Sequence, residues 1–286
     1  MAPRIRAGTS GYSYKSWRGP FYPADLAQDE WLSFYAGQLP TVEINNTFYR
    51  MPREHVVAAW RDAVPDDFRF VIKASRRITH QHRLKNAAEA TDYLVRRTAV
   101  LGERLGAVLF QLPPNLRMDH ERLKAFQQHL PADYPAAFEF RHPSWQDPVV
   151  DELLQAAGHV RVVSHDNDGG SDPADLPPTA NDAPTGKLVY LRLRASEYSS
   201  AALKKWHASI LLSGARDAYV FFKHEDDGTG PALARSFVDL GSPSMPGRSG
   251  RSSKQPVAAS KPAGPKKAGP TRGKSRKGSA PGKRTS

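Results

Sequence analysis

Phe138-Glu139-Phe140-Arg141-His142 has the pattern of a short buried strand that ends in charged side chains. Alternate residues of a strand face the same side, so Glu139 and Arg141 share one face. Several other apolar segments also end in polar residues, which predicts a polar site at one rim of a closed α/β barrel. The predicted strands are residues 4–9, 41–46, 69–74, 107–112, 136–141, 159–165, 187–193 and 217–223.

The connections between most of these strands carry helical patterns. Asp25 is predicted to cap a helix that includes Trp31 and Tyr35, because apolar residues recur there at helical spacing. Later helices are expected at 199–212 and 230–240.

Strands that alternate with helices predict a parallel (β/α)8 barrel of the TIM type over residues 1–240. No Gly-x-Gly-x-x-Gly motif follows the first strand, which argues against an open dinucleotide-binding sheet. Residues 166–186 are rich in Asp, Gly and Pro and show no helical period. We expect them to form a loop over the barrel mouth.

The formal net charge of +12 is unevenly distributed along the chain. Residues 241–286 hold 12 Lys or Arg and no Asp or Glu, which leaves 29 basic and 29 acidic residues in 1–240. This tail lacks aromatic residues and is dominated by Gly, Pro, Ser, Ala and Lys, so it is predicted to be disordered. Its basic runs are typical of arms that bind nucleic acid weakly, and a solubilising extension without a specific partner is the alternative.

The chain contains no cysteine, which excludes disulfides, thiolate nucleophiles and thiolate-bound zinc. No apolar run approaches the length of about 20 residues that crosses a membrane. A strand is predicted from residue 4, with no apolar signal segment before it. These features predict a cytoplasmic protein without membrane association.

The carboxylates at the predicted rim need partners if they are buried. Glu43 and Asn45 lie on the same face of their strand, and Lys73 on the neighbouring strand is the expected partner of Glu43. Lys73 could bind an anion, form a structural ion pair, or act as a Schiff-base nucleophile if its pKa is lowered. The network as a whole could hold the barrel together, or could also bind substrate.

Histidines follow three of the predicted strands. His80 and His142 are candidates for proton transfer, with a hydrogen-bonded loop role as the alternative. Together with Glu43 and Glu139 they could form a metal site, but no His-Glu-x-x-His or similar spacing is present. No metal ligand or cofactor is therefore assigned.

Residues 12–22 contain five aromatic side chains, with Tyr12 and Trp17 among them. Such rings can stack on a sugar or nucleobase, whereas the alternative is that they pack against the barrel end as a plug. Further candidates for substrate binding are the polar residues at the strand ends, namely Asn45, Lys73, Gln111, Arg141, Asp166 and Arg194.

Several spaced motifs resemble those of the DUF72 family, also called YecE-like proteins, over approximately residues 4–240. They are Gly8-Thr9-Ser10-Gly11-Tyr12 with Trp17 and Phe21-Tyr22-Pro23, Val42-Glu43-Ile44-Asn45 with Thr47-Phe48-Tyr49, Lys73-Ala74 with Ile78-Thr79-His80, Leu109-Phe110-Gln111-Leu112-Pro113-Pro114, and Phe138-Glu139-Phe140-Arg141-His142-Pro143-Ser144-Trp145. The resemblance implies a TIM-type barrel but no stated activity. It weakens at Leu191-Arg192-Leu193-Arg194-Ala195 and Lys223-His224-Glu225, so we expect different substrate contacts from the last two strands.

The favoured interpretation is an enzyme, with hydrolase, lyase and isomerase as the candidate classes, that acts on a small polar or anionic substrate of the sugar or nucleotide type. Glu43, Glu139, His80 and His142 would supply acid-base chemistry at the C-terminal barrel mouth. The alternative is a non-catalytic metabolite-binding protein whose basic tail contacts nucleic acid.

Overall fold

The computed structural model describes residues 2–166, 169–170, 188–223 and 228–241. Within these residues, eight parallel strands close into a barrel, because the pairing of β5 with β6 joins the two sides of the sheet. The order around the barrel is β1, β2, β3, β4, β5, β6, β8, β9, and β9 pairs with β1. The predicted TIM-type barrel is confirmed. The barrel strands are β1 (Arg4–Ser10), β2 (Thr41–Ile44), β3 (Arg69–Lys73), β4 (Leu105–Gln111), β5 (Ala136–Glu139), β6 (Val160–Asp166), β8 (Leu188–Leu193) and β9 (Asp217–Phe222).

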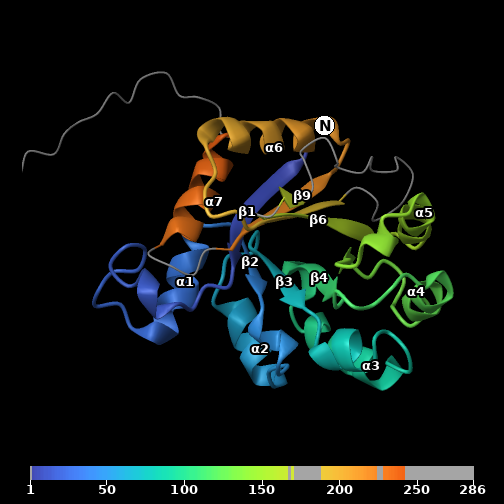
Figure 1. The fold of residues 1–286 in the computed structure, drawn as a ribbon. Helices are drawn as coiled ribbons and strands as arrows, with labels where there is room; N and C mark the ends of the chain where they lie inside the picture. The colour runs from blue at the N-terminus through green and yellow to red at the C-terminus, as the bar shows by residue number, and fades with distance from the viewer. Residues whose placement is uncertain (1, 167–168, 171–187, 224–227, 242–286) are drawn as a thin grey trace, which may run out of the picture. The chain divides into compact units, whose positions relative to one another are not determined.

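Helices surround the strands, as Figure 1 shows. They are α1 (Trp31–Ala36), α2 (Glu54–Asp62), α3 (Ala88–Ala99), α4 (His120–Gln127), α5 (Pro148–Ala156), α6 (Ser200–Leu212) and α7 (Thr229–Asp239). The last two match the helices predicted from periodicity. No helix in the described part of the chain is long and apolar enough to cross a membrane.

The first predicted helix begins later than expected. Asp25 lies in a turn and caps no helix, and α1 begins at Trp31 after the 3-10 turn η2 (Gln28–Glu30). The carbonyl oxygen of Leu26 accepts hydrogen bonds from the side chains of Arg18 and Trp31, at 3.2 and 3.3 Å. These side-chain bonds occupy the acceptor that a helix starting at Asp25 would use for its own backbone.

The sixth connection contains a short strand, β7 (Gly169–Gly170), which pairs antiparallel with the end of β6. The rest of the loop predicted at 166–186 lies outside the described residues except for Asp166. The same holds for the predicted tail beyond Gly241.

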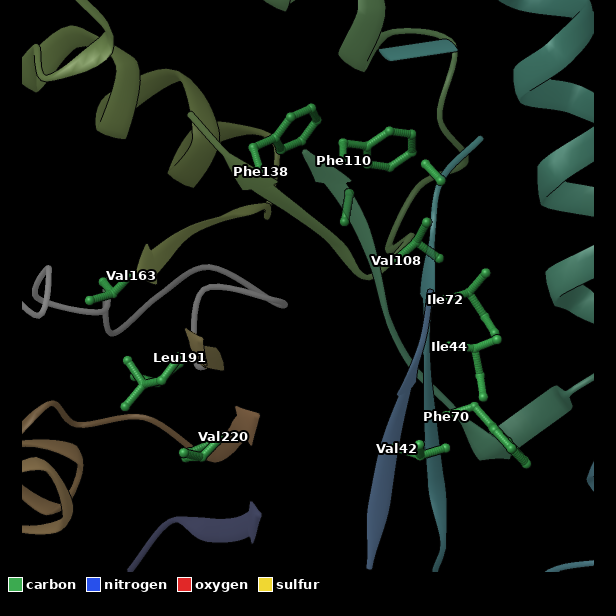
Figure 2. Packing of buried hydrophobic residues seen from close by; sticks show 14 of the residues in the cluster. Val42, Ile44, Phe70, Ile72, Val108, Phe110, Phe138, Val163, Leu191 and Val220 are labelled. Atoms are coloured by element: carbon green, nitrogen blue, oxygen red, sulfur yellow. The ribbon is translucent and has the colours of Figure 1, made fainter. Parts of the chain in front are cut away.

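The strands separate two apolar layers. Side chains that face outward pack against the helices; Figure 2 shows examples such as Phe110 and Phe138, whose stacked rings lie 5.2 Å apart on β4 and β5. Side chains that face inward form a smaller cluster inside the barrel, which we call the inner layer. It consists of Val71, Ala107, Leu109, Ala137, Val160, Val162, Tyr190, Tyr219 and Phe221.

The inner layer occupies the middle of the barrel, with polar residues towards both ends of the strands. At the N-terminal end a cavity of about 210 Å³ is lined by Arg4, Arg69, Arg216 and Asp217, among others. Towards the C-terminal end the inward-facing positions of β2, β5 and β8 carry charged side chains, because the period of two that places apolar residues outward places these inward.

The strands β1 and β2 approach each other closely at Gly8. A Cβ atom at this position would lie 2.0 Å from the backbone oxygen of Thr41, so only glycine fits. This contact brings the end of β1 into register with Glu43, since Ser10 and Glu43 are paired residues.

Candidate functional site

Two glutamates are buried inside the C-terminal end of the barrel. Glu43 is the third residue of β2 and Glu139 is the last residue of β5, with exposed fractions of 0% and 1%. A single guanidinium joins them. Arg192 on β8 donates from Nη2 to Glu43 Oε1 at 2.8 Å and from Nη1 to Glu139 Oε2 at 2.7 Å. Arg192 therefore links three strands across the barrel interior.

Tyr190, two residues before Arg192 on the same face of β8, donates its hydroxyl hydrogen to Glu43 Oε2 at 2.5 Å. Both oxygens of Glu43 are thereby occupied. Burial favours the neutral form of Glu43, but the Arg192 charge and the hydrogen bonds from Tyr190 and Arg192 outweigh it. The pKa of Glu43 lies below its ordinary value, so the carboxylate is ionised at neutral pH.

Glu139 is held in the same way by more cations. Burial opposes its ionisation, but the guanidinium groups of Arg192, Arg194 and Arg141 outweigh burial and lower the pKa of Glu139 to about 2. Gln111 at the end of β4 also donates from Nε2 to Glu139 Oε2 at 2.8 Å. A carboxylate in this state is an anchor for cations and a weak base at neutral pH.

Lys73, at the end of β3, does not pair with Glu43 as predicted. Its Nζ donates to Gln111 Oε1 at 2.9 Å and lies 4.4 Å from the centre of the Phe48 ring. The expectation failed because Arg192 and Tyr190 take both oxygens of Glu43. Burial, followed by the charge of Arg192, lowers the pKa of Lys73 to about 8.

Arg141 and Arg194 lie on the outer side of Glu139. Arg141 Nε is 3.4 Å and Arg194 Nη2 is 3.6 Å from Glu139 Oε1. Arg194 Nη2 also donates to Ser164 Oγ at 2.7 Å and lies 3.8 Å from Asp166 Oδ2. Arg194 Nε is buried without a hydrogen-bond partner among the residues that the structure describes.

His80 is near Lys73, and both side chains contact the Phe48 ring. Its ring packs edge-on against Phe48 with 4.9 Å between ring centres. Burial, followed by the charges of Lys73 and Arg141, lowers the pKa of His80, so the imidazole is neutral at pH 7. His80 lies in a π-helical turn, η4 (Arg77–Gln81), that places it above the end of β3.

His142 has a local structural role. Its Nδ1 accepts a hydrogen bond from the backbone N–H of Ser144 at 3.1 Å and thereby caps the 3-10 turn η6 (Pro143–Trp145). This matches the alternative of a hydrogen-bonded loop residue. Nothing in the described structure connects His142 to the network around Glu139.

The aromatic loop after β1 is packed. Trp17 is fully buried and lies 4.8 Å from Tyr14, 5.7 Å from Phe21 and 6.3 Å from Tyr22, measured between ring centres. Trp17 is therefore part of a packed aromatic cluster, as in the plug alternative, and is not available to a ligand at the barrel mouth. Tyr12 is half-buried, and burial raises its pKa.

The remaining predicted residues lie at the strand ends as expected. Gln111 is buried and bridges Lys73 to Glu139. Asn45 directly follows β2 with a partly exposed side chain, and Asp166 ends β6. No group of three or more His, Asp or Glu side chains suitable for a metal is found in the described ranges.

Arg192 is the central residue of the network, and sequence reasoning missed its role. The signal was present, because Tyr190, Arg192 and Arg194 alternate with Leu191 and Leu193 along β8. A period of two places all three polar residues on the inner face. The sequence predicts Arg194 as a rim residue, whereas Arg192 falls in the segment where the family resemblance weakens.

The fold and the site define a TIM-type barrel protein with a buried ionic network below its C-terminal mouth. Residues 6–256 match the family described as "Protein of unknown function DUF72". This match covers most of the chain, so the chain belongs to the DUF72 family.

Two curated proteins are similar to this chain in sequence. UPF0759 protein YecE of Escherichia coli (strain K12) is 33% identical over 138 residues, which are 46% of this chain and 51% of YecE. The matched segment thus spans about half of YecE. UPF0759 protein YunF of Bacillus subtilis (strain 168) is 25% identical over 251 residues, covering 77% of this chain and 89% of YunF.

Solved structures of the family have the same fold. A DUF72 family protein from Thermotoga maritima superposes with a TM-score of 0.71 at 26% identity, covering 83% of this chain and 98% of that protein. A DUF72 family protein from Enterococcus faecalis gives 0.60 at 19% identity, covering 83% and 97%. The second likeness shows the fold alone.

Proposed function

We propose that this protein is an enzyme that acts on a small anionic substrate, sugar- or nucleotide-like, at the C-terminal mouth of the barrel. The observation that carries the proposal is the arrangement of Arg141 and Arg194 outside a buried network. Glu139 holds both guanidinium groups in place, while Arg192, from inside the barrel, makes the largest contribution of any cation to its charge compensation. Donors on the outer guanidinium groups remain available for an anion.

The charge at the mouth supports an anionic substrate. The cations Lys73, Arg141, Arg192 and Arg194 face the carboxylates Glu43, Glu139 and Asp166. With Lys73 protonated, the cations exceed the carboxylates by one. Arg194 Nε adds a buried donor with no partner in the part of the chain that the structure describes, and an acceptor oxygen of a bound anion would satisfy it.

The pKa values assign the roles. Ionised Glu43 and Glu139 hold the guanidinium groups and do not deliver protons at neutral pH. Lys73 has a pKa of about 8, and burial lowers the pKa of His80 below its ordinary value. Both residues contact Phe48, and they are the candidates for proton transfer in the proposed reaction.

Anion binding provides the first test. The protein is titrated calorimetrically with inorganic phosphate at constant ionic strength, as wild type, Arg141→Met, Arg194→Met and the control Arg77→Met. Arg77 is an exposed arginine that contacts the exposed Glu89 carboxylate at 3.5 Å. Each charged hydrogen bond to the anion is worth about 1.5–3 kcal/mol, so affinity should fall about tenfold or more in each mouth variant. Equal affinity in all four proteins would refute the anion site.

Turnover separates an enzyme from a binding protein. Purified protein is incubated with a mixture of sugar phosphates, nucleotides and small organic acids, and mass spectrometry follows each compound. Time-dependent loss of a compound in the wild type, but not in Lys73→Met, supports the enzyme. Saturable binding without any conversion would instead favour a metabolite-binding protein.

A further inference from the structure

The contacts of the Lys73 amino group differ from those of a lysine in an ion pair. Its Nζ contacts an amide oxygen, Gln111 Oε1, on one side and the Phe48 ring on the other. Within the described ranges no carboxylate lies at ion-pair distance from Nζ, although Glu43 and Glu139 are close enough to influence it. The guanidinium of Arg192 occupies the position between the two glutamates that an ammonium could have taken.

This environment favours the uncharged amine. Burial and the positive charge of Arg192 lower the pKa of Lys73 to about 8, against an ordinary value of 10.5. At pH 8 about half of Lys73 is therefore uncharged, compared with about 0.3% of an ordinary lysine. An uncharged amine has a free lone pair and is a nucleophile towards carbonyl carbon.

Other groups near Lys73 are placed to hold an anionic substrate next to its amine. Arg141 and Arg194 lie beyond Gln111 and Glu139, on the side where the proposed anion binds. Thr79 Oγ1 lies 3.3 Å from the Ser75 carbonyl oxygen and 2.9 Å from His80 Nδ1, so the His80 ring is held in place next to the end of β3.

We propose that Lys73 Nζ forms a Schiff base with a small aldehyde or ketone that carries a carboxylate or phosphate group. This inference rests on the proposed anion site, because Arg141 and Arg194 would hold the anionic group while Nζ attacks the carbonyl carbon. Gln111 fixes Nζ through one hydrogen bond, and the Phe48 face excludes water from one side of the amine.

The step balances without an oxidant or reductant. The Nζ lone pair forms a C–N bond as the carbonyl π bond opens, and the oxygen gains a proton to give a carbinolamine. The nitrogen loses a proton to a solvent water molecule. The same proton then returns to the hydroxyl group, which leaves as water while the C=N bond forms. The net change is amine, carbonyl compound and one proton going to iminium and water.

Reductive trapping tests the inference on the full chain. The protein is incubated with sodium cyanoborohydride and one of three aldehydes: glyoxylate, glycolaldehyde phosphate or uncharged glycolaldehyde. Peptide mapping by mass spectrometry then measures the rate of alkylation at Lys73 and at Lys124, a lysine of α4 that serves as the internal control. The Lys73→Arg variant identifies adducts formed elsewhere.

We expect Lys73 to be alkylated at least about tenfold faster than Lys124 at pH 8, because of its larger uncharged fraction. At Lys73 the anionic aldehydes should react faster than glycolaldehyde, and this advantage should disappear in Arg194→Met. The rate at Lys73 should level off above about pH 8. Equal rates at the two lysines, or no adduct at Lys73, would overturn the inference.

The phosphate titration of the same protein separates the two proposals. Phosphate binding that depends on Arg141 and Arg194, together with an unreactive Lys73, would leave the anion site standing and remove the Schiff base. A reactive Lys73 without preference for anionic aldehydes would retain the nucleophile and contradict the anion site. Glyoxylate and glycolaldehyde phosphate also show which anion, carboxylate or phosphate, the site prefers.

Discussion

Replacing Arg192 with methionine removes the one cation that contacts both buried glutamates. Methionine has a similar length and is apolar, so the change mainly leaves Glu43 and Glu139 without their shared partner. Loss of one member of a buried ion pair typically costs about 3–5 kcal/mol. The pKa of Glu139 offers a second measure: its fall from 4.5 to about 2 corresponds to about 3 kcal/mol of preference for the charged form, part of which comes from Arg194 and Arg141. We therefore expect Arg192→Met to lower the free energy of unfolding by about 3–5 kcal/mol at pH 7.

The pH dependence should also change sign. In the wild type, the folded pKa of Glu139 lies below the ordinary value, so the stability that it contributes is present above pH 4.5 and lost as pH falls towards 2. In Arg192→Met, burial of Glu43 is no longer balanced by a cation, so its pKa should rise above 4.5 in the folded state, while Arg194 and Arg141 still act on Glu139. The folded variant then binds more protons than the unfolded chain. Its stability should increase as pH falls from 7 to 5.

Urea unfolding followed by tryptophan fluorescence at pH 7, 6 and 5 measures both effects. Arg77→Met is the matched control, because Arg77 and Glu89 form an exposed pair, and such surface changes usually stay within about 0.5 kcal/mol. Adding Glu43→Gln and Glu139→Gln to Arg192→Met should recover part of the loss. A loss below about 1 kcal/mol for Arg192→Met, or stability that falls with acid between pH 7 and 5, would refute this account of the network.

Three further predictions concern substitutions at residues other than Arg192. Burial lowers the pKa of His159 to about 4, so stability should fall as pH drops from about 6.5 to 4, by up to about 3 kcal/mol; His159→Leu should flatten that part of a urea-unfolding pH series. Gly8→Ala should lower the melting temperature, since its Cβ would lie 2.0 Å from Thr41 O, and overpacking of this kind costs about 1–3 kcal/mol; an unchanged melting temperature in calorimetry would contradict the close contact. Tyr190→Phe removes the hydroxyl bonded to Glu43 and should cost about 1–3 kcal/mol by urea unfolding, with no effect expected if that bond is absent in solution.

The barrel could be predicted from sequence because its signal is local. Each strand is a short apolar run bounded by a helical pattern, and parallel strands buried on both faces are read from such runs. The predicted strand at 69–74 corresponds to β3, Arg69–Lys73, and that at 217–223 corresponds to β9, Asp217–Phe222. The first helix was less predictable, because the side chains that compete for the Leu26 carbonyl come from Arg18 and Trp31.

The partners within the site could not be predicted in the same way. Strand ends indicated that Glu43, Lys73 and Glu139 gather at one rim, and the structure places them there. Which cation meets which carboxylate depends on contacts across the barrel: Arg192 is 149 residues from Glu43 in the chain. The neighbouring strand suggested Lys73 as the partner of Glu43, but the guanidinium of Arg192 on β8 reaches both glutamates, with one terminal nitrogen for each.

The inner layer separates two regions of charge within one barrel. Phe221, Leu109 and Val71 lie between the glutamate network and the arginines around Asp217 at the other end of the strands. Since distant sites without shared partners contribute additively to stability, a substitution at one end should leave the energetics of the other unchanged. Such a barrel is modular along its axis: new chemistry can be installed at the mouth, by evolution or by engineering, while the opposite end continues to secure the fold.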